Sequence, residues 1–292
     1  MPEFSFASLL RSQIDALVAA RLPALTSLTL NDIAAFDDTC ALELLLRAPW
    51  VTNLRSLRLE NCHVRDAGID QLRHHQLPLL QDLSLARNAL SDRAGVELMC
   101  AVLPALRRLD LSSNALSAQS PKLWAAVEAE LEARHGRGLR YWLGTVQELI
   151  FSGMGPEFGD EAVADLARAR LPSLRSLCLV NSGLSDAAVA ALAGAEWMRH
   201  VVSLDIGRNI EIGRDPAPWA ALAAAPLHEL RHLKLTFLIL GRGAQEALGG
   251  SAWLGGLEAL SFGRRLAADS PVRRAAAFLA LEAAGRVLYD IL

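Results

Sequence analysis

A recurring pattern of leucines constrains this chain more than any other feature of its sequence. The spacing L-x-x-L-x-L-x-x-N/C-x-L is matched in full by residues 54–64, 80–90 and 106–116. Weaker copies begin at residues 25, 146, 174, 201, 230 and 257, so nine copies follow one another along the chain. Consecutive copies begin 26 to 29 residues apart, except for one step of 40 residues after residue 106. A period of this length indicates a solenoid built from strand-containing repeats.

Each copy predicts a short strand, because alternate leucines place their side chains on one face of an extended segment. The residues after the strands begin with polar capping residues and continue with apolar residues at helical spacing. One repeat cannot bury its own apolar face, so neighbouring repeats stack and form a continuous core. We therefore predict a right-handed α/β horseshoe of about nine repeats, with a parallel sheet on the concave face and helices on the convex face.

A single domain is expected to extend over residues 1–292. Its predicted parts are a helical cap over 1–24, repeats over 25–116, an extended insertion over 117–145, repeats over 146–270 and a second helical cap over 271–292. The caps are expected because the end repeats would otherwise leave an edge of the core open to solvent. The Asn or Cys position of the motif should satisfy backbone groups where the chain leaves a strand. It is occupied by Cys62, Asn88, Asn114, Ser182 and Asn209 in five copies, and by Ile33, Met154, Leu238 and Arg265 in the other four.

These long repeats, each with a helix, resemble the ribonuclease-inhibitor-like subclass of the leucine-rich-repeat superfamily. The same subclass is found in NOD-like receptors and in Ran GTPase-activating proteins. The resemblance covers roughly residues 22–267. It implies a module that binds another protein, but it does not imply which one, since these solenoids bind many unrelated partners. The chain lacks the cysteine density of ribonuclease inhibitor and the phosphate-binding loop of a complete NOD-like receptor.

Composition argues against several other classes of protein. A formal net charge of −3 and the lack of a basic block give no reason to expect a nucleic-acid partner. No apolar run reaches the roughly 18 residues of a membrane span, and the amphipathic N-terminal segment does not have the pattern of a signal peptide. Four scattered cysteines favour free thiols in a reducing compartment. We expect a cytoplasmic protein, and the preference for arginine over lysine indicates a bacterial source.

The 40-residue step contains an insertion that does not follow the repeat pattern. A Ser-Pro pair at 120–121 starts a predicted helix that continues to about Arg134, and Tyr141 and Trp142 follow it. Insertions in solenoids often contribute to binding sites, so both aromatic residues are candidates for contact with a partner. The alternative is a longer helix whose aromatic residues fold back onto the edge of the repeats. Trp124 is expected in the core in either case.

Three columns of side chains are expected to point outward from the sheet, at the third, fifth and seventh positions of each copy. Opposite charges fall beside each other in these columns, Asp82 with Arg108 and Asp205 with Lys234. Part of the charge is therefore expected to be neutralised along the sheet.

Apolar residues interrupt these polar columns near the middle of the chain. Ile150, Cys178 and Val180 form a predicted apolar patch that could anchor a partner, although a few outward apolar residues are normal on any surface. The residues predicted to bind a protein partner are Arg58, Arg108, Asp110, Tyr141, Trp142, Ile150, Cys178, Val180, Asp205 and Lys234.

One motif points to zinc chemistry. Residues 228–232, His-Glu-Leu-Arg-His, match the H-E-x-x-H pattern of zinc peptidases, in which a helix places both imidazoles on one metal. Here the match overlaps the leucines of a repeat, so the segment should lead into a strand. His228 and His232 would then lie roughly 13 Å apart, at about 3.3 Å per residue, which is too far to share a zinc ion. We expect no metal at this segment.

The sequence therefore predicts a protein-binding scaffold with no catalytic activity and no cofactor. Its partner would bind to the concave sheet together with the insertion. A GTPase-activating role, by analogy with leucine-rich-repeat GTPase activators, is the alternative. Arginines at the ends of predicted strands that could assist phosphoryl transfer are Arg87, Arg208 and Arg264. Peptidase activity at the His-Glu-Leu-Arg-His segment is a second, disfavoured alternative.

Overall fold

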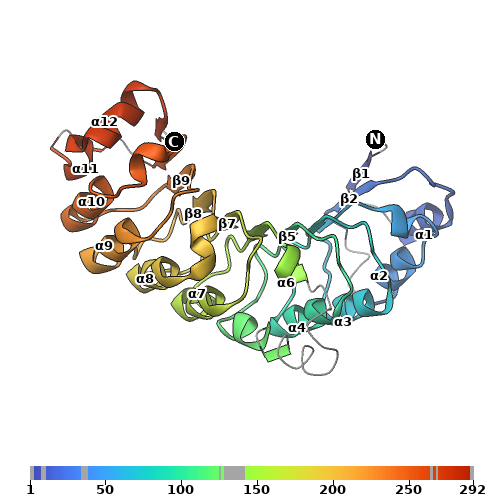
Figure 1. Ribbon diagram of the computed structural model, residues 1–292. Helices are drawn as coiled ribbons and strands as arrows, with labels where there is room; N and C mark the ends of the chain where they lie inside the picture. Colours follow the sequence, from blue (N-terminus) through green and yellow to red (C-terminus); the bar gives the residue numbers. More distant parts are fainter. Residues whose placement is uncertain are drawn as a thin grey trace. The chain divides into compact units, whose positions relative to one another are not determined.

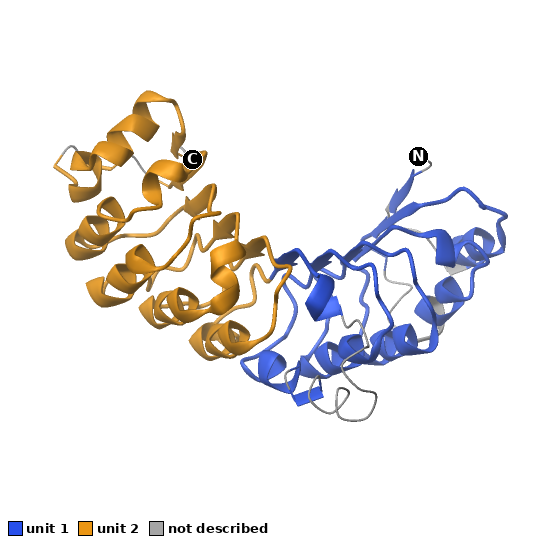
Figure 2. Ribbon diagram, viewed as in Figure 1, with its two compact units in different colours: residues 1–150 blue, residues 151–292 orange. Residues whose placement is uncertain are grey.

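The computed structural model describes residues 3–7, 11–33, 39–124, 126–127, 142–263, 266–267 and 269–289. The chain divides into two compact units, coloured separately in Figure 2. Unit 1 is Met1–Ile150 and unit 2 is Phe151–Leu292. Each unit alternates short parallel strands with helices or turns, as the repeat pattern predicts.

Unit 1 contains six described strands, each parallel to its neighbours in chain order. They are β1 (Glu3–Ala7), β2 (Ser27–Asn31), β3 (Ser56–Glu60), β4 (Asp82–Ser84), β5 (Arg108–Asp110) and β6 (Glu148–Ile150). The described helices are α1 (Arg11–Ala19), α2 (Thr39–Leu46), α3 (Asp66–Asp70), α4 (Asp92–Cys100) and α6 (Trp142–Thr145), with short 3-10 helices η2 (Val51–Asn53) and η3 (Gln71–His74). Figure 1 shows α2, α3 and α4 along one side of the strands.

Unit 2 contains five described strands, also parallel and in chain order. They are β7 (Ser176–Cys178), β8 (Ser203–Asp205), β9 (His232–Leu235), β10 (Ala259–Phe262) and β11 (Val287–Tyr289). The described helices are α7 (Gly159–Arg168), α8 (Asp186–Gly194), α9 (Pro216–Ala224), α10 (Arg242–Gly249), α11 (Pro271–Arg274) and α12 (Ala276–Ala283), with η4 (Glu196–His200) and η5 (Leu254–Gly256). Helices α7 to α10 line one side of this unit (Figure 1).

All nine strands predicted from the repeat are confirmed, as β2 to β10, and each begins at the third position of its motif copy. The strand register pairs equivalent leucines, so that Leu57 lies beside Leu28 on one side and Leu83 on the other. These three side chains have no exposed surface. The continuous core therefore comes from the same motif positions that define the repeat.

The polar position of the motif connects neighbouring repeats. The Asn114 amide nitrogen donates to the backbone oxygens of Leu85 and Leu111, both at 2.9 Å. Its amide oxygen accepts from the backbone N–H groups of Asn88 and Leu90, both at 3.2 Å. Asn88 and Asn209 make equivalent contacts in their own repeats. The predicted role of this position, to satisfy backbone groups where the chain leaves the strand, is confirmed at these three residues.

The ends of the chain differ from the prediction. Helical caps were expected over 1–24 and 271–292, but each end also adds a strand, β1 beside β2 and β11 beside β10. Both segments therefore contain helices, α1 at one end and α11 with α12 at the other, together with a strand that the sequence did not predict. The physical reason is the open backbone edge of β2 and of β10, whose N–H and C=O groups an added strand satisfies better than a helix can. That the whole chain forms a single domain stays a prediction.

The helices with described bounds are short, and the longest of these, α7, has 10 residues. A helix needs about 20 mainly apolar residues to cross the hydrocarbon core of a bilayer. No helix in the described part of the chain meets this requirement.

Candidate functional site

The side chains that point outward from the strands form a surface in each unit, which we call its strand face. In unit 1 a network of ion pairs centred on Asp82 occupies this face. The Oδ2 atom of Asp82 accepts from Arg58 Nη2 at 2.6 Å and from Arg58 Nε at 3.1 Å. Its Oδ1 atom accepts from Arg108 Nη1 at 3.0 Å. Asp82 thus holds one arginine from each neighbouring strand, β3 and β5.

Arg108 extends the network across β5 and β6. Its Nη2 donates to Asp110 at 3.2 Å, and its Nε lies 3.3 Å from Glu148 Oε2. Burial by itself would lower the pKa of the Arg108 guanidinium, but the hydrogen bond to Asp82 and the three nearby carboxylates raise it. Arg108 is therefore a fixed positive charge among carboxylates, and the predicted pairing of Asp82 with Arg108 is confirmed.

A cavity of about 570 Å³ opens on the same face over β1 to β4. Its lining includes Glu3, Thr29, Asn31, Arg58, Glu60 and Asp82. The Arg58 side chain is 37% exposed and that of Asp82 is 19% exposed, so the network can be reached from solvent. Ser84, although at an outward position, is fully buried, and its hydroxyl donates to Glu60 Oε1 at 3.0 Å. The accessible part of the face is therefore charged rather than apolar.

The strand face of unit 2 carries a second predicted charge pair. Lys234 Nζ lies 3.7 Å from Asp205 Oδ2, so that prediction is also confirmed. The Lys234 side chain is 53% exposed, whereas that of Asp205 is only 16% exposed. A partner at this face would meet the lysine first.

Cys178 and Val180 lie in the same unit, and both are half-buried. The Cys178 sulfur is 3.2 Å from the hydroxyl oxygen of Ser152. Burial raises the pKa of the Cys178 thiol, and the contact with Ser152 offsets only part of this effect. The thiol therefore stays protonated at neutral pH, where a protonated thiol is a poor nucleophile.

Comparison with known proteins identifies the repeat. A sequence profile described as a Leucine Rich repeat matches residues 52–72, which contain β3. An internalin from Listeria monocytogenes has a similar fold, with a TM-score of 0.57 and 18% sequence identity, over 98% of this chain and 71% of the internalin chain. The chain is a leucine-rich-repeat solenoid. A chain of the Rad7 and Elc1 complex in yeast is also similar, with a TM-score of 0.55 and 17% identity, over 89% of the solenoid.

The solenoid covers 62% of that yeast chain, which is less than two thirds of its length. Among curated protein sequences, none matches the solenoid. Similarity at this level of identity establishes the fold alone. Membership of the ribonuclease-inhibitor-like subclass and a bacterial source stay predictions.

The prediction that Trp142 contacts a partner is wrong. Its side chain has no exposed surface, and its indole N–H donates to the backbone oxygen of Leu98 at 3.0 Å. Its ring meets that of Trp124 edge-on, with 5.6 Å between ring centroids. The alternative, in which an aromatic residue of the insertion folds back onto the repeats, therefore holds for Trp142, and Trp124 is in the core as predicted. Tyr141 and Arg134 lie outside the described residues.

The predicted apolar patch is distributed over both units. Ile150 is the last residue of unit 1 and is half-buried at the end of β6, whereas Cys178 and Val180 belong to unit 2. Arg58, Arg108 and Asp110 are brought together on unit 1, and Asp205 and Lys234 on unit 2. That Ile150 forms one binding surface with the residues of unit 2 stays a prediction.

The His-Glu-Leu-Arg-His segment is not a helix. His228 and Glu229 lie in a turn, and His232 begins β9, as the leucine positions predict. Glu229 accepts from His200 at 3.1 Å, while His232 lies 3.8 Å from a different carboxylate, that of Glu258. A turn that leads into a strand does not provide the helical spacing that the zinc peptidases use. The absence of zinc stays a prediction.

Two of the three arginines considered for phosphoryl transfer lie in the described part of the chain. Arg87 and Arg208 are exposed in turns after their strands, with φ angles of 57° and 59°. The guanidinium of Arg208 lies 4.5 Å from the centroid of the Phe237 ring, and this cation–π contact holds it against the solenoid's own surface. Arg264 lies outside the described residues. The GTPase-activating role stays a hypothesis.

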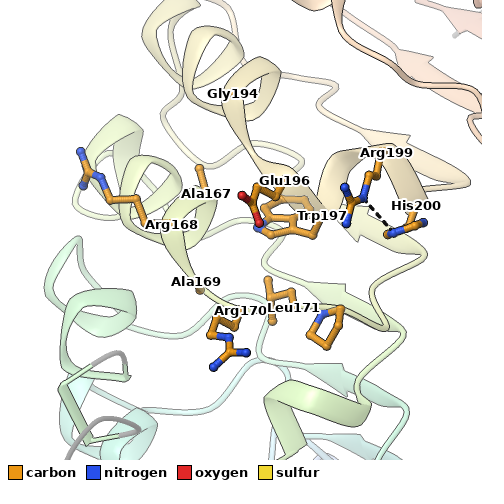
Figure 3. A pocket seen from close by; sticks show the side chains of 11 residues that line it. Ala167, Arg168, Ala169, Arg170, Leu171, Gly194, Glu196, Trp197, Arg199 and His200 are labelled. Carbon is orange, nitrogen blue, oxygen red and sulfur yellow. Dashed lines mark hydrogen bonds between the residues drawn. The ribbon is translucent and has the colours of Figure 1, made fainter.

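Sequence reasoning missed a second cavity, in unit 2, between the ends of α7 and α8 (Figure 3). Several of its residues are basic. The sequence signal for this cavity was the density of arginine and histidine in two segments, R-A-R-L-P at 168–172 and E-W-M-R-H at 196–200. Those segments lie between motif copies, where the leucine motif does not specify which side chains line a surface.

Proposed function

We propose that this solenoid is a non-enzymatic scaffold that binds a partner protein through the strand face of unit 1. The observation that carries the proposal is the network in which Asp82 holds Arg58 and Arg108, beside a cavity of about 570 Å³. Both arginines present a guanidinium whose position is already fixed. A partner that binds them therefore restricts little additional side-chain motion.

The charges of this face favour a partner whose carboxylates meet the arginines and whose basic groups meet the carboxylates. The network contains the arginines Arg58 and Arg108, and the carboxylates around them are Glu60, Asp82, Asp110 and Glu148. Charge complementarity of this kind contributes mainly to specificity and to the rate of association. The solved yeast structure with a similar fold is described as a complex of Rad7 and Elc1, which supports a protein as the class of partner. We place this binding in the cytoplasm.

The test is capture of a partner, followed by measurement with purified proteins. The immobilised chain and its Asp82→Asn variant are exposed to lysate of the native source, and captured proteins are identified by mass spectrometry. The affinity of each captured candidate is then measured by calorimetry. We expect Asp82→Asn to weaken binding by about tenfold, because it removes the charge that holds both arginines.

Arg93→Gln is the matched control. Arg93 lies on α4, its side chain is 71% exposed, and its carboxylate partner Glu97 is 3.7 Å away. This variant removes a charge from the helical side of unit 1 and should change the affinity less than twofold. Equal binding by wild type and Asp82→Asn, with a loss in Arg93→Gln, would place the interface on the helices and overturn the proposal. Circular dichroism of each variant checks that it is folded.

A further inference from the structure

The cavity of unit 2 has a volume of about 550 Å³ and is lined by the ends of two successive repeats. The last residues of α7 and the segment after them contribute Arg168, Arg170, Leu171 and Pro172. The repeat that follows contributes Gly194, Glu196, Trp197, Arg199 and His200. Figure 3 shows Arg199 and His200 together on one side of Trp197, with Arg168 on the other side.

Arg199 is held in place by a chain of two hydrogen bonds. Its Nε donates to His200 Nε2 at 3.0 Å, and His200 Nδ1 lies 3.1 Å from Glu229 Oε1. The neutral imidazole with its hydrogen on Nδ1 satisfies both contacts, because it donates to the carboxylate and accepts from the guanidinium. Glu229 thus fixes His200, and His200 fixes Arg199. The two terminal nitrogens of the guanidinium take no part in this chain.

Within the described residues, no carboxylate is paired with the charge of Arg199. Among the residues that the structure describes, its contact is the neutral nitrogen of His200, whereas Arg168 is paired with Asp165 at 2.7 Å. A guanidinium with its two terminal nitrogens available binds a carboxylate in bidentate fashion. Glu196, which also lines the cavity, disfavours a ligand with a double negative charge. A singly charged carboxylate is therefore the better fit.

Part of the wall is apolar, and its largest side chain is held in place. Trp197 is 4% exposed and its indole N–H donates to the backbone oxygen of Leu166 at 3.2 Å, so the ring cannot turn without losing a buried hydrogen bond. Pro172 is exposed and provides further apolar surface, whereas Leu171 is only 1% exposed. Cavities that combine an apolar wall with one oriented charged group are typical of sites that bind a defined ligand.

We propose that this cavity binds an acidic segment of a partner protein, with an Asp or Glu carboxylate on Arg199 and an adjacent apolar side chain against Pro172 and Trp197. The proposal rests on the proposed function only in that the partner is a protein. It adds a second contact region, on unit 2, with its own ligand chemistry.

Gly194 provides a way to fill the cavity without removing a charge. A Cβ atom built on this glycine meets no atom within 4 Å, although the residue lines the cavity. Gly194→Leu should therefore fold normally and occupy the space intended for the apolar side chain. Arg199→Gln removes the charge and leaves the volume almost unchanged. The two variants test the two halves of the proposed recognition separately.

The probes are fluorescein-labelled hexapeptides with one Asp or Glu beside one Leu or Phe, each compared with its Asn or Gln counterpart by fluorescence anisotropy. We expect the best acidic peptide to bind the wild-type chain about tenfold more tightly than its amide counterpart. Arg199→Gln and Gly194→Leu should each weaken that binding by about tenfold. Gly144→Leu is the control for volume, since its Cβ also meets nothing within 4 Å. Arg242→Gln, on α10, is the control for charge.

Equal binding of acidic and amide peptides, or unchanged binding by Arg199→Gln and Gly194→Leu, would overturn the proposal. Failure of every peptide to bind the wild-type chain would also overturn it. The capture experiment with Asp82→Asn is judged separately. If capture depends on Asp82 but no peptide binds, only the cavity proposal is overturned. If peptides bind but capture does not depend on Asp82, only the proposed interface on the strand face of unit 1 is overturned.

Discussion

Asp92, the first residue of α4, accepts hydrogen bonds from both the backbone N–H and the hydroxyl of Ser117, at 2.7 and 2.6 Å. Ser117 lies one repeat further along the chain. The same relationship joins Asp66 to Ser91 and Asp160 to Ser185. A carboxylate at the start of one helix thus fixes the start of the following helical segment. The repeats are connected by this second set of polar contacts as well as by the asparagines.

This relationship predicts a dependence of stability on pH. Burial alone would raise the pKa of Asp92, but the hydrogen bonds from Ser117 and Ser120 outweigh it and lower the pKa below its usual 3.8. A group whose pKa is lower in the folded state stabilises the fold above its ordinary pKa, and this contribution is lost as the pH falls through the folded value. Asp92→Ala should cost about 1–2 kcal/mol of unfolding free energy at pH 7.

Urea denaturation followed by circular dichroism at pH 7, 5 and 3 measures this effect. The difference between wild type and Asp92→Ala should be the same at pH 7 and 5 and smaller at pH 3. Asp70→Ala is the control. Asp70 pairs with Arg73 at 3.2 Å on the surface, so its loss should cost less than about 0.5 kcal/mol. A difference that is as large at pH 3 as at pH 7 would contradict the prediction.

Asn114→Ala should destabilise unit 1 by about 2–4 kcal/mol, because the substitution leaves two backbone N–H groups and two backbone oxygens without their side-chain partner. Asn114 is only 7% exposed, so water cannot easily replace the amide. Asn53→Ala removes a single hydrogen bond, to the backbone oxygen of Pro23 at 3.1 Å, and should cost less than about 1 kcal/mol. Equal costs for the two variants, measured in urea, would show that the buried amide is not essential.

Trp142→Ala should lower the free energy of unfolding by about 3–5 kcal/mol, because it removes a large buried side chain and leaves a cavity. Trp142→Phe keeps a ring beside Trp124 and loses only the hydrogen bond to Leu98, so it should cost about 1–2 kcal/mol. The affinity of the Phe variant for a captured partner should equal that of the wild-type chain. A lower affinity with unchanged stability would restore Trp142 as a contact residue.

The leucine spacing predicts nine strands correctly because each strand is determined by residues within a single repeat. Strands β1 and β11 could not be predicted in this way. Residues Glu3–Ala7 contain no copy of the motif, and they are extended because their backbone pairs with Ser27–Asn31, with partners 24 residues apart in the sequence. Trp142 is a similar case, since its hydrogen-bond partner, Leu98, is 44 residues away in the sequence.

The contacts between Asp and Ser were predictable in principle. Asp92 follows a serine at the start of a helix, and Asp66 and Asp160 occupy the same place in their repeats. The repeat pattern shows that such residues recur. Considered one helix at a time, however, each of them looks like a local cap of its own helix. Their role between repeats depends on how closely consecutive helices approach, which the spacing of leucines does not determine.

The last prediction concerns the strand face of unit 2. If this face also contacts the partner, Val180→Asp should weaken binding by at least about 2 kcal/mol, because it places a carboxylate on a half-buried apolar contact beside the protonated Cys178. The side chain points away from the core, so the fold should be kept, and circular dichroism checks this. Ser261 is unsuitable as a control, since it is only 6% exposed although it occupies an outward position.

Ala259→Asp is the better control for Val180→Asp. Ala259 is half-buried at the third motif position of β10, so the same carboxylate is added to the same face near the end of unit 2. We expect it to change partner affinity by less than about 0.5 kcal/mol, as for most surface substitutions. A loss in Ala259→Asp with full binding by Val180→Asp would move the contact toward the end of unit 2. Full binding by both variants would leave the strand face of unit 1 and the cavity beside Arg199 as the contact regions.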